Sequence, residues 1–223
     1  MKEEIYNRKS KTFFAEELET ITLIHFDAKY YFRDIQYILK PDTTEEIVAS
    51  ENEFIQRLLR SFWRLGIIEI SKLFLESTNQ HYNLISYLKE LIQNYNEYEW
   101  INGLQKTKLE EFLNLITSKE VSTTIEKIKI QRDKYFAHLD RNPKFKLKEK
   151  QILIEEIFKL LNITEEIISE LSNKCLDAHW DFEVSGAEKA GRILEAYSAL
   201  NEKIETELNA KRDKYIELRR KEK

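Results

Sequence analysis

One short stretch of the sequence, RDKYFAH at residues 132–138, combines side chains that could cleave RNA. The imidazole of His138 titrates near neutrality, so it can take a proton from a ribose 2′-hydroxyl or give one to the leaving 5′-oxygen. The guanidinium of Arg132 can bind two phosphate oxygens and stabilise the charge that develops in the transition state. This chemistry would need neither a metal nor a cofactor, because the 2′-hydroxyl of the substrate is itself the nucleophile.

The stretch lies at the end of a helix predicted over residues 122–138. Helical periodicity places Arg132 on the same inward face as Ile128. A buried guanidinium needs an anion or several acceptors, and the side chains of neighbouring residues such as Asp133 diverge on a helix. We therefore expect Arg132 to be substantially buried, and to bind an acidic residue such as Glu69, a second subunit or a phosphate.

His138 follows Arg132 by six residues, which is about 240° around an ideal helix. The two groups converge only if the helix ends near His138 or if two chains combine their groups. Residues 127–150 contain nine Lys and Arg and three acids, a net charge of +6 (9 − 3) in a protein of net charge −4. Such a patch can attract a polyanion, and Lys134 and Arg141 are its candidate substrate-binding residues. The alternative is a helix C-terminus with a capping histidine and a salt-bridged arginine.

The rest of the chain is predicted to form helices that could position residues 132–138. Apolar residues recur at intervals of three and four, and the second segment is apolar around most of its circumference, so we expect it at the centre of a bundle. Within it, Gly66 would allow a neighbouring backbone to approach closely. The predicted helices cover residues 16–39, 44–75, 83–98, 107–117, 122–138, 147–175 and 186–220. Trp180 and Phe182 are expected to pin the irregular segment before the last helix to the body.

Composition excludes several classes of protein. Four Gly and two Pro in 223 residues are too few for the turns of most β-rich folds. The single Cys175 excludes an internal disulfide, and no two of the four histidines share a helix with metal-ligand spacing, so we expect no metal site. No apolar run could cross a membrane and the N-terminus is not a secretory signal, so we expect a cytoplasmic protein.

At residues 132–138 the sequence resembles the HEPN superfamily of helical nucleic-acid-associated domains. The hallmark of that superfamily is an Arg and a His separated by four to six residues, the first of them usually polar. The continuation HLDR and the upstream FWRLGIIEISKLF resemble the AbiU-type abortive-infection branch. The resemblance implies an all-α, up-and-down helical bundle whose homodimer brings two motifs to one cleft. It also implies that Arg132 contacts the scissile phosphate, His138 transfers protons and Asp133 orients one of them.

We therefore predict a metal-independent HEPN endoribonuclease that acts in phage defence or as a toxin, with RNA as substrate and a protein antitoxin as a candidate partner. The alternative is a catalytically inactive helical module that binds RNA or protein. A third hypothesis is a structural pairing role for the charged C-terminal helix. We expect the bundle to cover residues 1–176, and residues 177–223 to form an irregular segment and an extra C-terminal helix.

Overall fold

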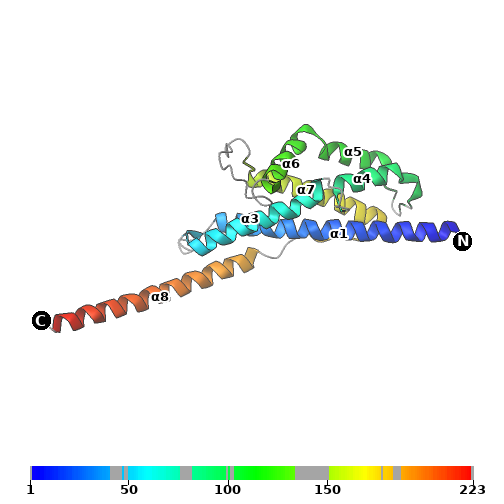
Figure 1. Cartoon of the computed structure of the whole chain (residues 1–223). Helices are drawn as coiled ribbons and strands as arrows, with labels where there is room; N and C mark the ends of the chain where they lie inside the picture. The colour runs from blue at the N-terminus through cyan, green and yellow to red at the C-terminus, as the bar shows by residue number, and fades with distance from the viewer. Residues whose placement is uncertain are drawn as a thin grey trace. The chain divides into compact units, whose positions relative to one another are not determined.

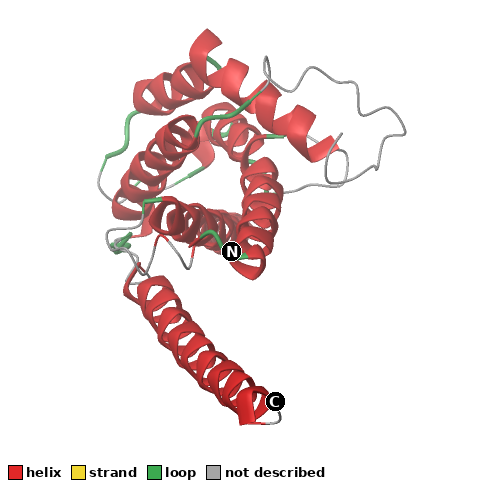
Figure 2. Cartoon of the chain, turned by 90° about the vertical axis from the view of Figure 1, so that its left-hand side faces the viewer, coloured by secondary structure: helices red, strands yellow, loops and turns green. Residues whose placement is uncertain are grey.

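The fold is seen in a computed structural model, and it is almost entirely helical (Figures 1 and 2). The structure describes residues 2–40, 47, 50–75, 82–98, 100, 103–133, 151–176, 178–182 and 187–221. No strand occurs among these residues. The all-α bundle with an added C-terminal helix is therefore confirmed.

The helices follow the predicted order. Their labels and bounds are α1 (Lys2–Leu39), α3 (Glu53–Phe74), α4 (Leu84–Gln93), the short 3₁₀ turn η1 (Tyr95–Glu97), α5 (Lys106–Ile116), α6 (Lys119–Gln131), α7 (Ile154–Leu171), the π-helical turn η4 (Ser172–Leu176) and α8 (Ala187–Lys221). The bounds of α5 and α8 differ from the predicted ones by a single residue at each end.

Other helix ends differ from the prediction for local reasons. Helix α7 begins at Ile154, not at residue 147, because the carboxylate of Glu156 accepts the N–H of Leu153 at 2.9 Å and caps the first turn. Helix α4 begins where the Asn83 side chain accepts the N–H groups of Ile85 and Ser86. The α-helical part of α6 ends at Gln131, seven residues before the predicted end.

The chain divides into two compact units. The first comprises residues 1–32 and 62–184, and the second comprises residues 33–61 and 185–223. Helices α1 and α3 each contribute one part to each unit. The predicted division at residue 176 stays a prediction.

In the first unit, α4 packs beside α5, α5 beside α6, and α6 beside α7 (Figure 1). Its apolar core draws on every one of these helices. Fully buried members are Leu18, Ile21, Phe32, Ile67, Ile70, Leu73, Leu88, Leu91, Leu109, Ile116, Ile128, Ile157, Leu161 and Ile167. In the second unit, Ile35, Ile38, Ile55 and Leu59 are buried. Helix α3 was predicted to be buried on several sides, and its buried residues extend from Ile55 to Phe74, whereas Phe54 and Leu65 are exposed.

Gly66 of α3 gives room to an aromatic ring. A Cβ atom at this position would lie 2.8 Å from Cζ of Phe32 on α1. The Phe32 ring is fully buried and meets the ring of Trp63 edge-on at 5.6 Å. The predicted close approach is therefore made by a side chain and not by a neighbouring backbone.

No helix among the described residues is both long and apolar enough to span a bilayer.

Candidate active site

Arg132 and Asp133 directly follow the last residue of α6. The backbone of Arg132 keeps helical angles (φ −56°, ψ −52°), and its N–H is directed at the carbonyls of both Ile128 and Lys129. The two residues form a π-helical turn, so the helix widens at this point. Their side chains therefore leave the end of α6 from a wider turn than an ideal helix would provide.

The Arg132 guanidinium binds the carboxylate of its neighbour. Nε of Arg132 lies 2.8 Å from Oδ1 of Asp133. The expectation that these two adjacent side chains diverge was therefore wrong, whereas a second subunit or a phosphate as a further partner stays a prediction. The proposed partner Glu69 instead binds Nζ of Lys72 at 2.6 Å, one turn along α3. Within the described part of the chain, no hydrogen bond engages the Nη groups of Arg132.

Arg132 is only partly withdrawn from solvent. Its side chain is 28% exposed and that of Asp133 is 42% exposed, so the expected burial is met in part. A guanidinium fixed through Nε keeps its two Nη groups available for a bidentate contact. This arrangement could receive a phosphate from solvent without first breaking the ion pair with Asp133.

Two contacts fix the end of α6 that carries Arg132. The indole Nε1 of Trp63 on α3 donates to Oε1 of Gln131 at 2.9 Å. One turn earlier, Nζ of Lys127 lies 2.6 Å from Oε1 of Glu156 at the start of α7. The amine and the hydrogen bond from Leu153 hold the pKa of Glu156 below its usual range, although partial burial acts to raise it. The sequence pattern predicted neither contact, because neither pair is close along the chain.

Three of the predicted site residues lie outside the described residues. These are Lys134, His138 and Arg141. The structure therefore brings together Arg132 and Asp133, and the positions of His138 and of the two candidate substrate-binding residues stay predictions.

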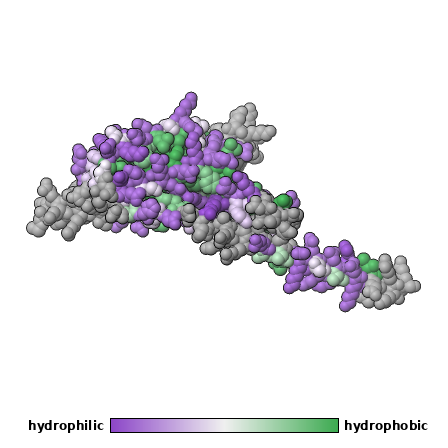
Figure 3. All heavy atoms as spheres, turned by 180° about the vertical axis from the view of Figure 1, so that it is seen from behind, coloured by the Kyte–Doolittle hydropathy of each residue, from purple (hydrophilic) through white to green (hydrophobic). Residues whose placement is uncertain are grey.

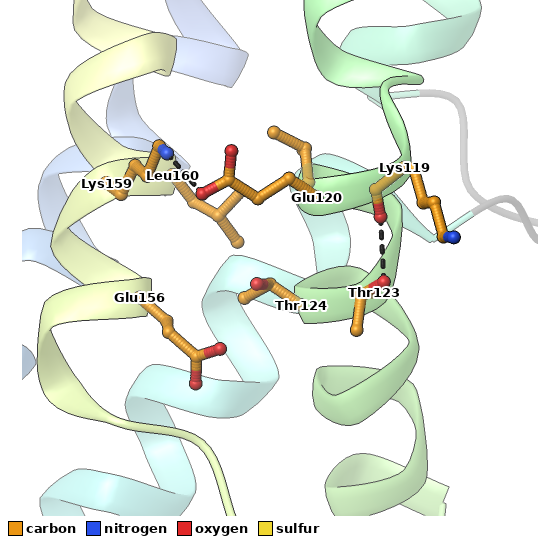
Figure 4. A pocket seen from close by; sticks show the side chains of 8 residues that line it. Lys119, Glu120, Thr123, Thr124, Glu156, Lys159 and Leu160 are labelled. Atoms are coloured by element: carbon orange, nitrogen blue, oxygen red, sulfur yellow. Dashed lines mark hydrogen bonds and ion pairs between the residues drawn. The ribbon is translucent and has the colours of Figure 1, made fainter.

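A groove of about 480 Å³ runs between α6 and α7 (Figure 4). It lies along the first turns of α6, away from Arg132, and its ionic groups are Lys119, Glu120, Glu156 and Lys159. The two positive and two negative charges cancel, and Lys159 pairs with Glu120 across the groove. Because the charges that line it sum to zero, this groove offers a polyanion no net electrostatic attraction.

A buried polar cluster joins α1 to α7. The fully buried His25 places Nε2 at 3.1 Å from Oε1 of Glu165, and Nζ of Lys29 binds the same carboxylate oxygen. Burial lowers the pKa of His25, an effect that outweighs the attraction of Glu165. Burial raises the pKa of Glu165, but the hydrogen bonds from His25 and Lys29 outweigh it, so this pKa is lowered.

Sequence reasoning missed this cluster, although a signal was present. His25 lies four residues after Ile21 and three before Ala28, on the inward stripe of the first helix. The cluster also holds the segment after η4, because Nζ of Lys29 donates to the carbonyl of Phe182 at 2.9 Å. Among the described residues, no group of three or more His, Cys, Asp or Glu could hold a metal ion.

The predicted anchoring of that segment is confirmed. The ring of Phe182 stacks on Phe26 of α1 with 5.4 Å between centroids. Trp180 also meets Phe26, with 6.4 Å between their rings. Both anchors are therefore aromatic rings packed on Phe26, and the ring of Phe182 also meets that of His25 edge-on at 5.6 Å between centroids.

Comparison with known proteins identifies one family. Residues 13–216 match the family model described as AbiU2 among the HEPN families. The match runs from α1 into α8 and includes residues 132–138. No curated protein and no solved structure matches the chain.

Proposed function

The chain belongs to the HEPN AbiU2 family, which associates it with abortive infection, and we propose that it is a metal-independent endoribonuclease. The observation that supports this proposal most directly is the geometry of Arg132. Its guanidinium lies at a helix end, is partly exposed, and donates Nε–H to the carboxylate of Asp133. The Nη/Nη edge of a guanidinium, which Nε does not belong to, can donate two parallel N–H groups to the non-bridging oxygens of a phosphodiester.

In the proposed reaction the ribose 2′-oxygen attacks the adjacent phosphorus. The O2′–P bond forms as the P–O5′ bond breaks, and the products are a 2′,3′-cyclic phosphate and a 5′-hydroxyl. His138 transfers the proton that leaves the 2′-hydroxyl or the proton that the 5′-oxygen gains. Arg132 stabilises the negative charge on the non-bridging oxygens, and Asp133 orients its guanidinium. In a homodimer, the Arg132 and His138 of two chains would face a common cleft.

Charge supports RNA as the substrate. The net charge of +6 within residues 127–150 contrasts with −4 for the whole chain, so a polyanion would be drawn to this region. Lys134 and Arg141 would hold phosphates on either side of the cleaved linkage. The reaction belongs in the cytoplasm, where RNA is available, and a protein antitoxin would keep it silent between infections.

The test is cleavage of a broad panel of RNAs by the purified chain in EDTA. We expect products with 2′,3′-cyclic phosphate ends. His138→Ala should reduce the rate by about 10²–10⁴-fold and Arg132→Ala by about 10²–10³-fold, with unchanged helical circular dichroism.

The chain provides matched controls for both variants. Arg57 is an exposed arginine that pairs with Glu53 at 3.6 Å, and His179 is an exposed histidine outside the motif. Arg57→Ala and His179→Ala should keep cleavage within about twofold of the wild-type rate. Full activity of His138→Ala would refute the proposal, and RNA binding without any cleavage would favour the inactive binding module.

A further inference from the structure

The middle of α8 carries an exposed apolar stripe. Leu200, Ile204 and Leu208 follow one another at intervals of four and are between 44% and 59% exposed. At about 100° per residue they lie within about 80° of one another, and Tyr215 lies on the same face after Lys211, which interrupts the stripe. In Figure 3 the described part of α8 is mostly hydrophilic, with a few paler and green residues along it.

Charge is distributed unequally along this helix. Between residues 195 and 207 the ionic groups are four Glu and one Lys, a net charge of −3 (−4 + 1). Between residues 211 and 214 they are three cations and one Asp, a net charge of +2 (3 − 1). All of these side chains are exposed. The helix therefore has an acidic half and a basic half on either side of Leu208.

We propose that α8 pairs in antiparallel orientation with α8 of a second copy of this chain. In that orientation the acidic half of each helix lies against the basic half of the other, whereas a parallel pair would place like charges together. A centre at Leu208 sets Leu208 against its own copy and places Leu200 level with residue 216 of the other helix, one position from Tyr215 on the stripe. The stripe is then covered from one end to the other.

The rim of the stripe agrees with this register. Glu205 and Arg212 lie on the same side of the stripe, at about 95° and 75° from its centre on the helical wheel. In an antiparallel pair the same sides of the two helices meet, so Glu205 of each copy faces Arg212 of the other. The symmetric pair therefore gains two such ionic contacts.

Helix stability provides a separate argument for a partner. A long helix in a protein owes most of its stability to packing of its apolar face and not to intrinsic propensity. In a single copy, the described side chains from residue 199 to residue 216 are all exposed. A second copy would supply the missing packing. This interface goes beyond the proposed nuclease activity and does not depend on it.

The first test compares the masses of full-length variants by sedimentation equilibrium without RNA. Leu208→Glu puts a charge into the centre of the stripe, and we expect it to weaken association by about 100-fold and to halve the mass at micromolar concentration. Ala199→Glu is the control, since Ala199 lies on the opposite face of the same helix and should leave the mass unchanged. A wild-type chain that is monomeric at tens of micromolar, or an unchanged mass for Leu208→Glu, would overturn the proposal.

A charge exchange tests the partner and the register. Glu205→Arg and Arg212→Glu should each weaken association by about tenfold, and the double variant should restore it because the two ionic contacts re-form with opposite sign. Failure of the double variant to recover would contradict the register.

Disulfide cross-linking tests the orientation in a Cys175→Ser background. Leu208→Cys should cross-link two copies, and Leu200→Cys should not, because an antiparallel pair sets the two Leu200 positions far apart. Cross-linking through position 200 would indicate a parallel pair and refute the proposal. None of these readouts involves cleavage, so the failure of the interface and the failure of the nuclease proposal are distinguishable.

Discussion

Replacing Glu17 by glutamine should stabilise the protein, by an amount that grows as the pH rises. Glu17 lies on α1 within the first unit, and it is only 9% exposed. Burial raises the pKa of its carboxyl group to about 7 from an ordinary value of 4.5, and the negative charge of Glu90 on α4 adds to this effect. The folded protein therefore holds a carboxylate in a place that disfavours its charge.

The magnitude follows from the difference between the two pKa values. A carboxyl group whose pKa is raised on folding binds its proton more tightly in the folded state, so its contribution favours the folded state at low pH. That advantage is lost as the pH rises through 4.5 towards 7. At about 1.4 kcal/mol per pKa unit, the raised pKa of Glu17 lowers the free energy of unfolding, relative to its contribution at low pH, by about 3 kcal/mol at pH 8 and by about 1 kcal/mol at pH 5. The glutamine side chain carries no such penalty at either pH.

The assay is urea unfolding at pH 5 and pH 8, followed by helical circular dichroism. The free energy of unfolding of Glu17→Gln, relative to the wild type, should be about 2 kcal/mol more favourable at pH 8 than at pH 5. Glu16→Gln is the matched control, because Glu16 is the adjacent residue on the same helix and its side chain is exposed. An equal gain at both pH values, or no gain at pH 8, would refute this account of Glu17.

Two further predictions concern packing and charge in the same unit. Gly66→Ala should destabilise the protein by about 1–2 kcal/mol in urea unfolding. The new Cβ would overlap the buried ring of Phe32, and the free-energy cost of that overlap should exceed the gain from the higher helix propensity of alanine. A gain in stability would contradict the observed contact. Glu165→Gln should cost about 1–3 kcal/mol at pH 7, since it leaves Lys29 without its carboxylate partner. That loss of stability should shrink as the pH falls through the lowered pKa of Glu165, because the carboxyl group is then protonated. The control is Glu166→Gln at the exposed neighbouring residue, which should change stability by less than about 0.5 kcal/mol. A loss of equal size for both variants would show that the cluster is not responsible.

Much of the fold could be predicted because helices are local structures. Periodic apolar residues and the scarcity of Gly and Pro were sufficient for an all-α bundle and for the order of its helices. The same periodicity correctly placed Ile128 in the core, since the face that a residue occupies depends only on its position in its own helix. It also placed Arg132 near that face, where the side chain is in fact partly covered.

The partners of these side chains were decided by tertiary structure. Trp63 reaches Gln131 across 68 positions of sequence, and His25 reaches Glu165 across 140. Contacts of this kind depend on the crossing angle of two helices and on the rotation of each about its axis. The apolar pattern of one helix does not determine either quantity. Arg132 shows the same limit at short range, because the helical wheel separates adjacent side chains and did not predict the contact between Nε of Arg132 and the carboxylate of Asp133.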